Sequence, residues 1–183
     1  MPLCSREDSA LVVVDLQDSF LAPISDKERI LRRSAFLIEI AGLLGVPILA
    51  TEQYAKRMGG TTELIAGLLG SSPQIDKMCF SSCRSDEFWK AWEQTGRRQA
   101  ILVGIETHIC VNQTAHDFLS RGFEVFVCAD ATGARMDGHE IGIERIRAAG
   151  AIIPHTESVA YEWLGTAASD DFKKALEIIK RYA

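Results

Sequence analysis

The sequence lacks the features that mark membrane proteins and nucleic-acid-binding proteins. Its longest nearly apolar run covers only residues 40–50, whereas about 20 residues are needed to cross a bilayer. Basic residues are not in excess, because 20 Lys and Arg stand against 25 Asp and Glu and give a formal net charge of −5. A nucleic-acid-binding surface usually shows a basic excess. We therefore expect neither a membrane nor a nucleic acid as a partner.

The sequence also lacks a cysteine pattern typical of disulfide-bonded proteins. The chain has five cysteines, an odd number, and no C-x-x-C spacing occurs among them. This pattern argues against a disulfide framework. The first ten residues lack a basic stretch followed by an apolar one, so no secretory signal is predicted. A chain with these free thiols is expected in a reducing compartment, the cytoplasm.

What the chain does have is a globular composition and a regular alternation of strand and helix patterns. With 183 residues, 47% of them hydrophobic, residues 1–183 are predicted to form a single domain. Strands are predicted at 10–14, 46–50, 75–77, 100–104, 123–128 and 151–153, and helices around 30–44, 64–69, 86–94, 111–119, 138–149 and 170–181. This order predicts an α/β fold, a three-layer doubly wound sheet of about six mostly parallel strands with helices on both faces.

Three side chains follow strands at one predicted edge of the sheet. Asp15 comes directly after the first strand, Lys77 ends the third, and Cys110 lies a few residues after the fourth, near a helix start. Ligands of doubly wound sheets bind at the carboxyl ends of the strands, so we expect these side chains to meet. A helix start and a lysine lower the pKa of a thiol, and a carboxylate within reach can take its proton. The set predicts acyl transfer through a thioester, although each residue alone is more often structural.

The segments that carry these residues resemble the isochorismatase-like cysteine hydrolases. The likeness runs from about Ala10 to Tyr182, nearly the whole chain. Its specific parts are ALVVVDLQDSF (10–20), DKMCFSS (76–82), GIETHICV (104–111) and Asp130–Ala131. Two further segments, TEQY (51–54) and SVAYEWLG (158–165), are similar to the isochorismatase domain-containing proteins, whose substrates are mostly unassigned.

The resemblance implies a role for each residue of the set. It implies that Asp15 is the general base, Lys77 its electrostatic partner and Cys110 the nucleophile. It also implies a cis peptide bond before Glu106, and an oxyanion hole formed by the backbone N–H groups of Glu106 and Cys110. The implied activity is hydrolysis of a small amide or related C–N bond by a cysteine hydrolase that forms a homo-oligomer.

Other side chains near these segments are candidates for the substrate pocket. They are Phe20, Gln53, Tyr54, Glu106 and His108, and Trp163 is a further aromatic candidate. Nicotinamidases of the same superfamily bind a metal through histidines after the second strand, whereas residues 52–55 contain none. The four histidines also lack the i, i+4 spacing of a helical zinc site. We therefore expect neither a metal nor a cofactor.

Two other functions remain open from the sequence. A non-catalytic relative would use the same pocket for binding or serve as an interaction subunit, although the intact Asp15, Lys77 and Cys110 set argues against it. A thiol redox sensor built on Cys110 would need a resolving cysteine. Cys79 and Cys83 flank the lysine segment at i, i+4, as either a redox pair or ordinary buried thiols.

Overall fold

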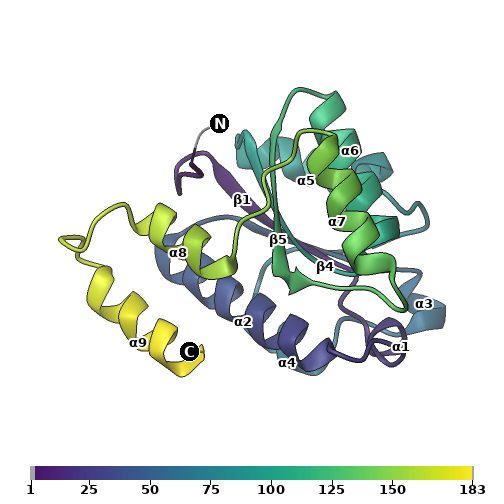
Figure 1. Ribbon diagram of the computed structural model, residues 1–183, viewed down its shortest axis with the longest axis horizontal. Helices are drawn as coiled ribbons and strands as arrows, with labels where there is room; N and C mark the ends of the chain where they lie inside the picture. Colours follow the sequence, from purple (N-terminus) through teal and green to yellow (C-terminus); the bar gives the residue numbers. More distant parts are fainter. Residues whose placement is uncertain (1–2, 183) are drawn as a thin grey trace.

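The computed structural model describes residues 3–182 and contains one five-stranded sheet between two layers of helices (Figure 1). All strand pairs are parallel, in the order β3-β2-β1-β4-β5. The strands are β1 (Ser9–Val14), β2 (Ile48–Gln53), β3 (Gln74–Lys77), β4 (Gln99–Gly104) and β5 (Glu124–Thr132). The predicted doubly wound α/β fold is therefore confirmed.

The predicted number of strands was wrong by one. Residues 151–153 were expected to form a sixth strand, but the described chain shows only a single parallel bridge there, between Phe126 and Ile152. Ile152 donates to Val125 and accepts from Val127, both at 2.9 Å. Pro154 follows two residues later and has no N–H to continue a ladder, which accounts for the short pairing.

The two faces of the sheet have separate cores because strand side chains alternate. On one face, Leu11 and Val13 of β1 pack with α2 (Lys27–Leu44), α4 (Glu63–Leu69), α8 (Thr156–Leu164) and α9 (Phe172–Tyr182). On the other face, Val12 and Val14 pack with α5 (Asp86–Thr95), α6 (Asn112–Ser120) and α7 (Gly138–Ala148). Figure 1 shows α2, α8 and α9 on one side of the strands and α5, α6 and α7 on the other. Both faces of β1 are buried, as its unbroken apolar run predicted.

Short elements complete the chain at the ends of the strands. They are α1 (Asp18–Leu21), α3 (Ala55–Met58), the 3₁₀ turn η1 (Ser82–Arg84) and η2 (Thr107–Val111), a single π-helical turn that leads directly into α6. None of the helices in the described part of the chain is long and apolar enough to cross a membrane.

The topology of the sheet leaves a crevice at the carboxyl ends of β1 and β4. From β1 the chain adds β2 and then β3 on one side, and then returns to add β4 and β5 on the other. Neighbouring strands whose connections run in opposite directions leave a crevice between them. Asp15 follows β1 and Cys110 follows β4, so both lie beside this crevice.

Candidate active site

Asp15 and Lys77 form a buried ion pair. The Nζ atom of Lys77 donates to Oδ2 of Asp15 at 2.7 Å, and the two side chains are 0% and 3% exposed, respectively. Lys77 also donates to Oε1 of Gln53 at 2.9 Å and to the carbonyl of Cys79 at 3.3 Å. These three acceptors match the three protons of an ammonium group. Sequence reasoning expected this pair, and the structure brings the two residues together.

Thr51 holds the second oxygen of the Asp15 carboxylate. Its hydroxyl donates to Oδ1 of Asp15 at 2.7 Å, and its carbonyl accepts from the Asp15 backbone N–H at 3.0 Å. Asp15 itself has a positive φ of 52°, a conformation in which aspartate is tolerated better than most residues. Each carboxylate oxygen has two lone pairs, so Asp15 retains a free acceptor site on each oxygen beside the bonds from Thr51 and Lys77. Sequence reasoning did not assign Thr51 a role.

Gln53 and Gln17 fix the neighbouring ends of β1 and β2. The side-chain oxygen of Gln17 accepts from the backbone N–H of Gln53 at 2.6 Å, and its amide nitrogen donates to the carbonyls of Gln53 and Gly59 at 3.2 and 2.6 Å. The Gln53 amide in turn donates to the carbonyl of Met78 at 3.0 Å. This bond leaves the Gln53 oxygen pointing to Lys77. Gln53 was expected at the pocket and lines it.

Cys110 lies in η2 with its thiol next to the ion pair. It is 7% exposed and lines the same pocket as Asp15. The pKa of the Cys110 thiol is raised to about 12, first by burial and then by the negative charge of Asp15, whereas Lys77 and the backbone N–H of Glu106 act to lower it. The expectation of a lowered pKa was wrong, because Lys77 is committed to Asp15 and the thiol is out of water.

Glu106 lies at the rim with its carboxylate engaged by the protein. The peptide bond between Ile105 and Glu106 is cis, at the position where the resemblance implied one. The Glu106 side chain is 8% exposed, and its Oε1 pairs with Nε of Arg135 at 3.0 Å. Its Oε2 accepts from the Arg135 backbone N–H at 3.4 Å and lies 3.6 Å from Nδ1 of His108.

The pocket that joins these groups is small and mainly apolar. It has a volume of about 110 Å³. Its lining consists of Asp15, Phe20, Gln53, Phe80, Ile105, Glu106, Ile109, Cys110 and Arg135. Phe20, Gln53 and Glu106 were predicted members, whereas sequence reasoning missed Phe80 and Arg135. Phe80 lies in the segment that resembled the lysine segment of the family, which was the one available signal for it.

Three of the predicted pocket residues lie elsewhere. Tyr54 precedes α3 with a positive φ of 50°, is 36% exposed and does not line the pocket. The His108 ring packs against Gly138 at the start of α7, where an added Cβ would lie 2.4 Å from Nδ1, so the ring also lies outside the lining. Trp163 of α8 is 2% exposed in the core on the α2 face of the sheet. It is a packing residue.

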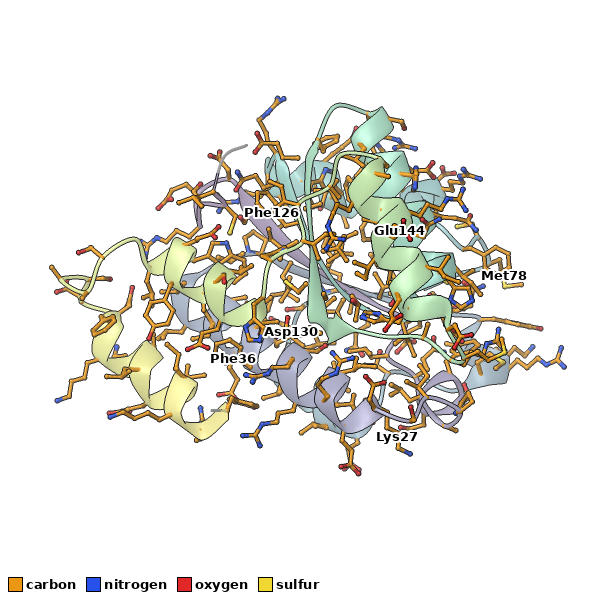
Figure 2. All side chains as sticks on the ribbon, in the orientation of Figure 1. Lys27, Phe36, Met78, Phe126, Asp130 and Glu144 are labelled. Carbon is orange, nitrogen blue, oxygen red and sulfur yellow. The ribbon has the colours of Figure 1, made fainter. Side chains whose placement is uncertain are left out.

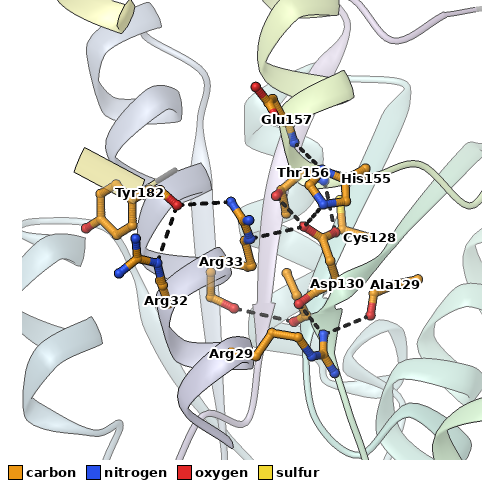
Figure 3. Close-up of polar contacts among 12 residues, drawn as sticks. Arg29, Arg32, Arg33, Cys128, Ala129, Asp130, His155, Thr156, Glu157 and Tyr182 are labelled. Atoms are coloured by element: carbon orange, nitrogen blue, oxygen red, sulfur yellow. Dashed lines mark hydrogen bonds and ion pairs between the residues drawn. The ribbon is translucent and has the colours of Figure 1, made fainter. Parts of the chain in front are cut away.

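Asp130 marks a second polar cluster, which serves the fold. Figure 3 shows its carboxylate between the start of α8 and Arg33 of α2. It accepts from the backbone N–H of Thr156 at 2.9 Å and from the Thr156 hydroxyl at 2.5 Å, and it pairs with His155 at 3.2 Å. Arg33 lies 3.8 Å from the same carboxylate. These contacts tie β5 to α2 and to the first turn of α8.

All five cysteines are free thiols, and residues 3–182 contain no cluster of three or more His, Cys, Asp or Glu side chains that could hold a metal ion. Cys83 is buried, and burial raises the pKa of its thiol to about 12. Cys79 is half-buried, and its carbonyl supports Lys77.

A family model decides where the chain belongs. The model for the isochorismatase domain matches residues 9–158. The chain belongs to the isochorismatase family. It is 35% identical over 178 residues to isochorismatase domain-containing protein 2A of Mus musculus, covering 95% of this chain and 84% of that protein. It is 32% identical over 179 residues to a protein of Phytophthora sojae named secreted isochorismatase effector Isc1, covering 95% and 85%.

Solved structures agree with this family assignment. A Caenorhabditis elegans protein described as MAR1 ribonuclease is 32% identical, with a TM-score of 0.92 and coverage of 98% of this chain and 93% of that chain. The Escherichia coli YcaC gene product, described as an octameric hydrolase of unknown specificity, is 21% identical, with a TM-score of 0.88 and coverage of 100% and 97%. This second likeness is one of fold. Proteins of this family are generally hydrolases.

Proposed function

We propose that this member of the isochorismatase family is a metal-independent cysteine hydrolase that cleaves a small amide or related C–N bond through a thioester on Cys110. The observation that carries the proposal is the buried ion pair between Asp15 and Lys77 beside the Cys110 thiol. Burying two charges costs several kcal/mol per ion. A buried ion pair in a pocket beside a thiol is therefore better explained by a role in catalysis than by a contribution to the stability of the fold.

The first half of the proposed reaction forms the thioester. The Cys110 sulfur attacks the substrate carbonyl carbon while its proton moves to Asp15, whose carboxylate lines the same pocket. The carbonyl oxygen becomes an oxyanion, which the backbone N–H groups of Glu106 and Cys110 stabilise. The backbone N–H of Glu106 acts to lower the pKa of the Cys110 thiol, so it favours negative charge at this place. Collapse of the intermediate breaks the C–N bond, and Asp15 returns the proton to the leaving amine.

The second half releases the acid. Asp15 takes a proton from a water molecule, the resulting hydroxide attacks the thioester carbon, and the sulfur leaves with that proton. Lys77 holds the Asp15 carboxylate in place between these transfers through its 2.7 Å bond. The nucleophile, the base and the oxyanion donors are all groups of the chain itself, so the proposed reaction uses neither a metal nor a cofactor.

The pocket supports a small substrate with an apolar part. Phe20, Phe80, Ile105 and Ile109 supply most of its walls, and its volume is about 110 Å³. A nucleic acid fits this chain poorly because the net charge is −5. The proposed partner is therefore a small molecule, and the ribonuclease description stays with the C. elegans protein.

The two alternatives fit the site less well. A peroxide sensor needs a thiol with a low pKa and solvent access, whereas the pKa of Cys110 is raised to about 12 and the residue is 7% exposed. A binding or interaction subunit gives no reason to retain a buried ion pair against a thiol.

Assembly and location are parts of the same proposal. We propose a homo-oligomer, because Met78, Phe80 and Met136 are 67%, 53% and 85% exposed and apolar groups of this kind suit a subunit interface. Met78 projects at the periphery of the molecule in Figure 2.

We also propose a cytoplasmic location, because five free thiols suit a reducing compartment. Light scattering and cell fractionation test these two statements.

The decisive experiment is the Cys110→Ala variant on a panel of small amides. We expect the variant to fold and its rate of ammonia or amine release to fall by at least about 1,000-fold. In the wild type, we expect intact-mass analysis to detect an acyl group on Cys110. The matched control is Cys79→Ala, which removes a half-buried thiol whose side chain is not part of the proposed machinery. Unchanged turnover in Cys110→Ala would contradict the mechanism.

A further inference from the structure

The carboxylate of Glu106 creates an electrostatic problem for the proposed reaction. It lines the same pocket as Cys110, which lies four residues further along the chain. Acyl transfer places negative charge first on the sulfur and then on the oxyanion. A carboxylate that lines the same pocket repels both charges, and Glu106 and Cys110 are both buried, where such repulsion is screened least.

Arg135 meets this carboxylate from the segment that precedes α7. Its Nε lies 3.0 Å from Oε1 of Glu106, and its backbone N–H donates to Oε2 at 3.4 Å. The two contacts engage both oxygens of one carboxylate from one residue. The Arg135 side chain is 49% exposed, whereas that of Glu106 is 8% exposed. Both residues line the pocket, and the arginine is the more exposed partner of the pair.

From this geometry we infer that Arg135 is a positioning residue that cancels the charge of Glu106 at the pocket rim, so that negative charge can develop at Cys110. The inference rests on the proposed function. His108 is a weaker partner, because its Nδ1 lies 3.6 Å from Oε2 and an imidazole carries charge only when protonated. The guanidinium of Arg135 stays charged at every working pH.

A competing role for Arg135 is direct binding of an anionic substrate group. Two alkylating agents separate the roles, because iodoacetamide is neutral and iodoacetate carries a carboxylate of similar size. Charge cancellation affects the reaction of Cys110 with both agents. Direct anion binding affects mainly the reaction with iodoacetate.

The experiment measures the alkylation rate constant of Cys110 at pH 9 in a Cys79→Ser background, with peptide mapping to confirm the modified residue. We expect Arg135→Gln to lower the rate with both agents by about 10-fold or more, the size of effect expected from one uncompensated charge nearby. Arg135→Lys keeps the charge and is expected to retain most of the rate. The double variant Glu106→Gln/Arg135→Gln is expected to regain it, which loss of structure alone would not produce.

The matched control is Arg84→Gln, which breaks a similar pair between Nε of Arg84 and Asp117 at 2.7 Å and is expected to leave both rates unchanged. An Arg135→Gln rate equal to that of the wild type, a loss confined to iodoacetate, or a double variant as slow as the single one would each overturn the inference. A wild-type Cys110 that stays unreactive from pH 9 to pH 12 would instead overturn the proposed nucleophile, and the inference with it.

Discussion

The Cys110 thiol shares its pocket with the Asp15 carboxylate, which is paired with Lys77, and this environment raises the pKa of the thiol. Burial and the Asp15 carboxylate raise its pKa to about 12, and Lys77 opposes this only in part. The nearby ammonium group is shared with Asp15, Gln53 and the Cys79 carbonyl. For the proposed reaction, the raised pKa favours a thiol that loses its proton during the attack over a thiolate that is already present before substrate binds.

This arrangement gives a prediction for Asp15→Asn that separates two roles of Asp15. Turnover should fall by at least about 100-fold because the thiol proton loses its acceptor. The pKa of Cys110 should nevertheless fall from about 12 toward its usual 9.0, because the nearby negative charge is removed while Lys77 remains. The pH dependence of Cys110 alkylation and an amide turnover assay measure the two effects.

The control for this prediction is Asp76→Asn. Asp76 neighbours Lys77 in β3, but its carboxylate accepts from the Ala55 N–H at 2.8 Å and does not line the pocket. An Asp15→Asn protein whose Cys110 pKa stays near 12 would contradict the electrostatic explanation.

At the residue scale the sequence was informative where one residue type carries the chemistry. Asp15, Lys77 and Cys110 follow strands and were found from that position. Thr51 and Arg135 were missed, because a threonine within a strand and an arginine in a loop are ordinary in sequence. Their roles come from contacts with Asp15 and Glu106, 36 and 29 residues away in the chain.

At the scale of elements, the central strands were predicted well and the elements around the site less well. β1 and β4 are buried at every position, so their apolar runs indicated them within one residue. β2 was predicted to end at Ala50 but continues to Gln53, and its polar second half pairs with β3 and supports Lys77. The π-helical turn η2 carried no sequence pattern that separates it from an ordinary helix. Helix α8 was not predicted, although its buried Val159, Ala160, Trp163 and Leu164 recur at helical spacing. Local sequence patterns predict secondary structure less well where side chains form a functional site, because packing in the core no longer determines the residue type there.

The close approach of β1 and β4 yields a prediction at Gly104. This residue has a φ of 115°, and an added Cβ would lie 2.1 Å from the carbonyl oxygen of Val14. Gly104→Ala should lower the free energy of unfolding by about 2–4 kcal/mol, because backbone must move and the φ is strained. Urea denaturation measures the change.

Gly42→Ala in α2 is the matched control for this substitution. A Cβ at Gly42 would meet nothing within 4 Å, and alanine favours a helix interior by about 0.5–1 kcal/mol. We expect this variant to be slightly more stable than the wild type. Equal stability of the two variants would contradict the close-approach argument.

At the scale of the whole molecule, buried thiols set the response to alkaline pH. Burial raises the pKa of Cys83 and Cys110 from 9.0 to about 12, and it raises the pKa values of Cys4 and Cys128 as well. Above pH 9 the unfolded chain loses these protons while the folded chain keeps them. The stability from these groups is therefore complete below pH 9 and is lost as the pH rises toward 12 and beyond.

We predict that the free energy of unfolding falls between pH 8 and pH 10 by about 1 kcal/mol for each such thiol. Denaturant unfolding at several pH values, with a reductant present, measures the slope. Cys83→Ala removes one buried thiol, so the free energy of unfolding of this variant should fall by about 1 kcal/mol less than that of the wild type over the same pH range. A slope identical to that of the wild type would show that Cys83 does not contribute.

The parallel order of the sheet determines at which stage of folding the proposed active site is assembled. Asp15 and Lys77 are 62 residues apart, and the strand that leads to Cys110 pairs with β1 only after residues 99–104 have been made. Such distant parallel pairings form slowly, because long loops must close first. No early fragment of the chain contains the complete set. The proposed activity should therefore appear only after β1 and β4 have paired, and its recovery during refolding would report that pairing.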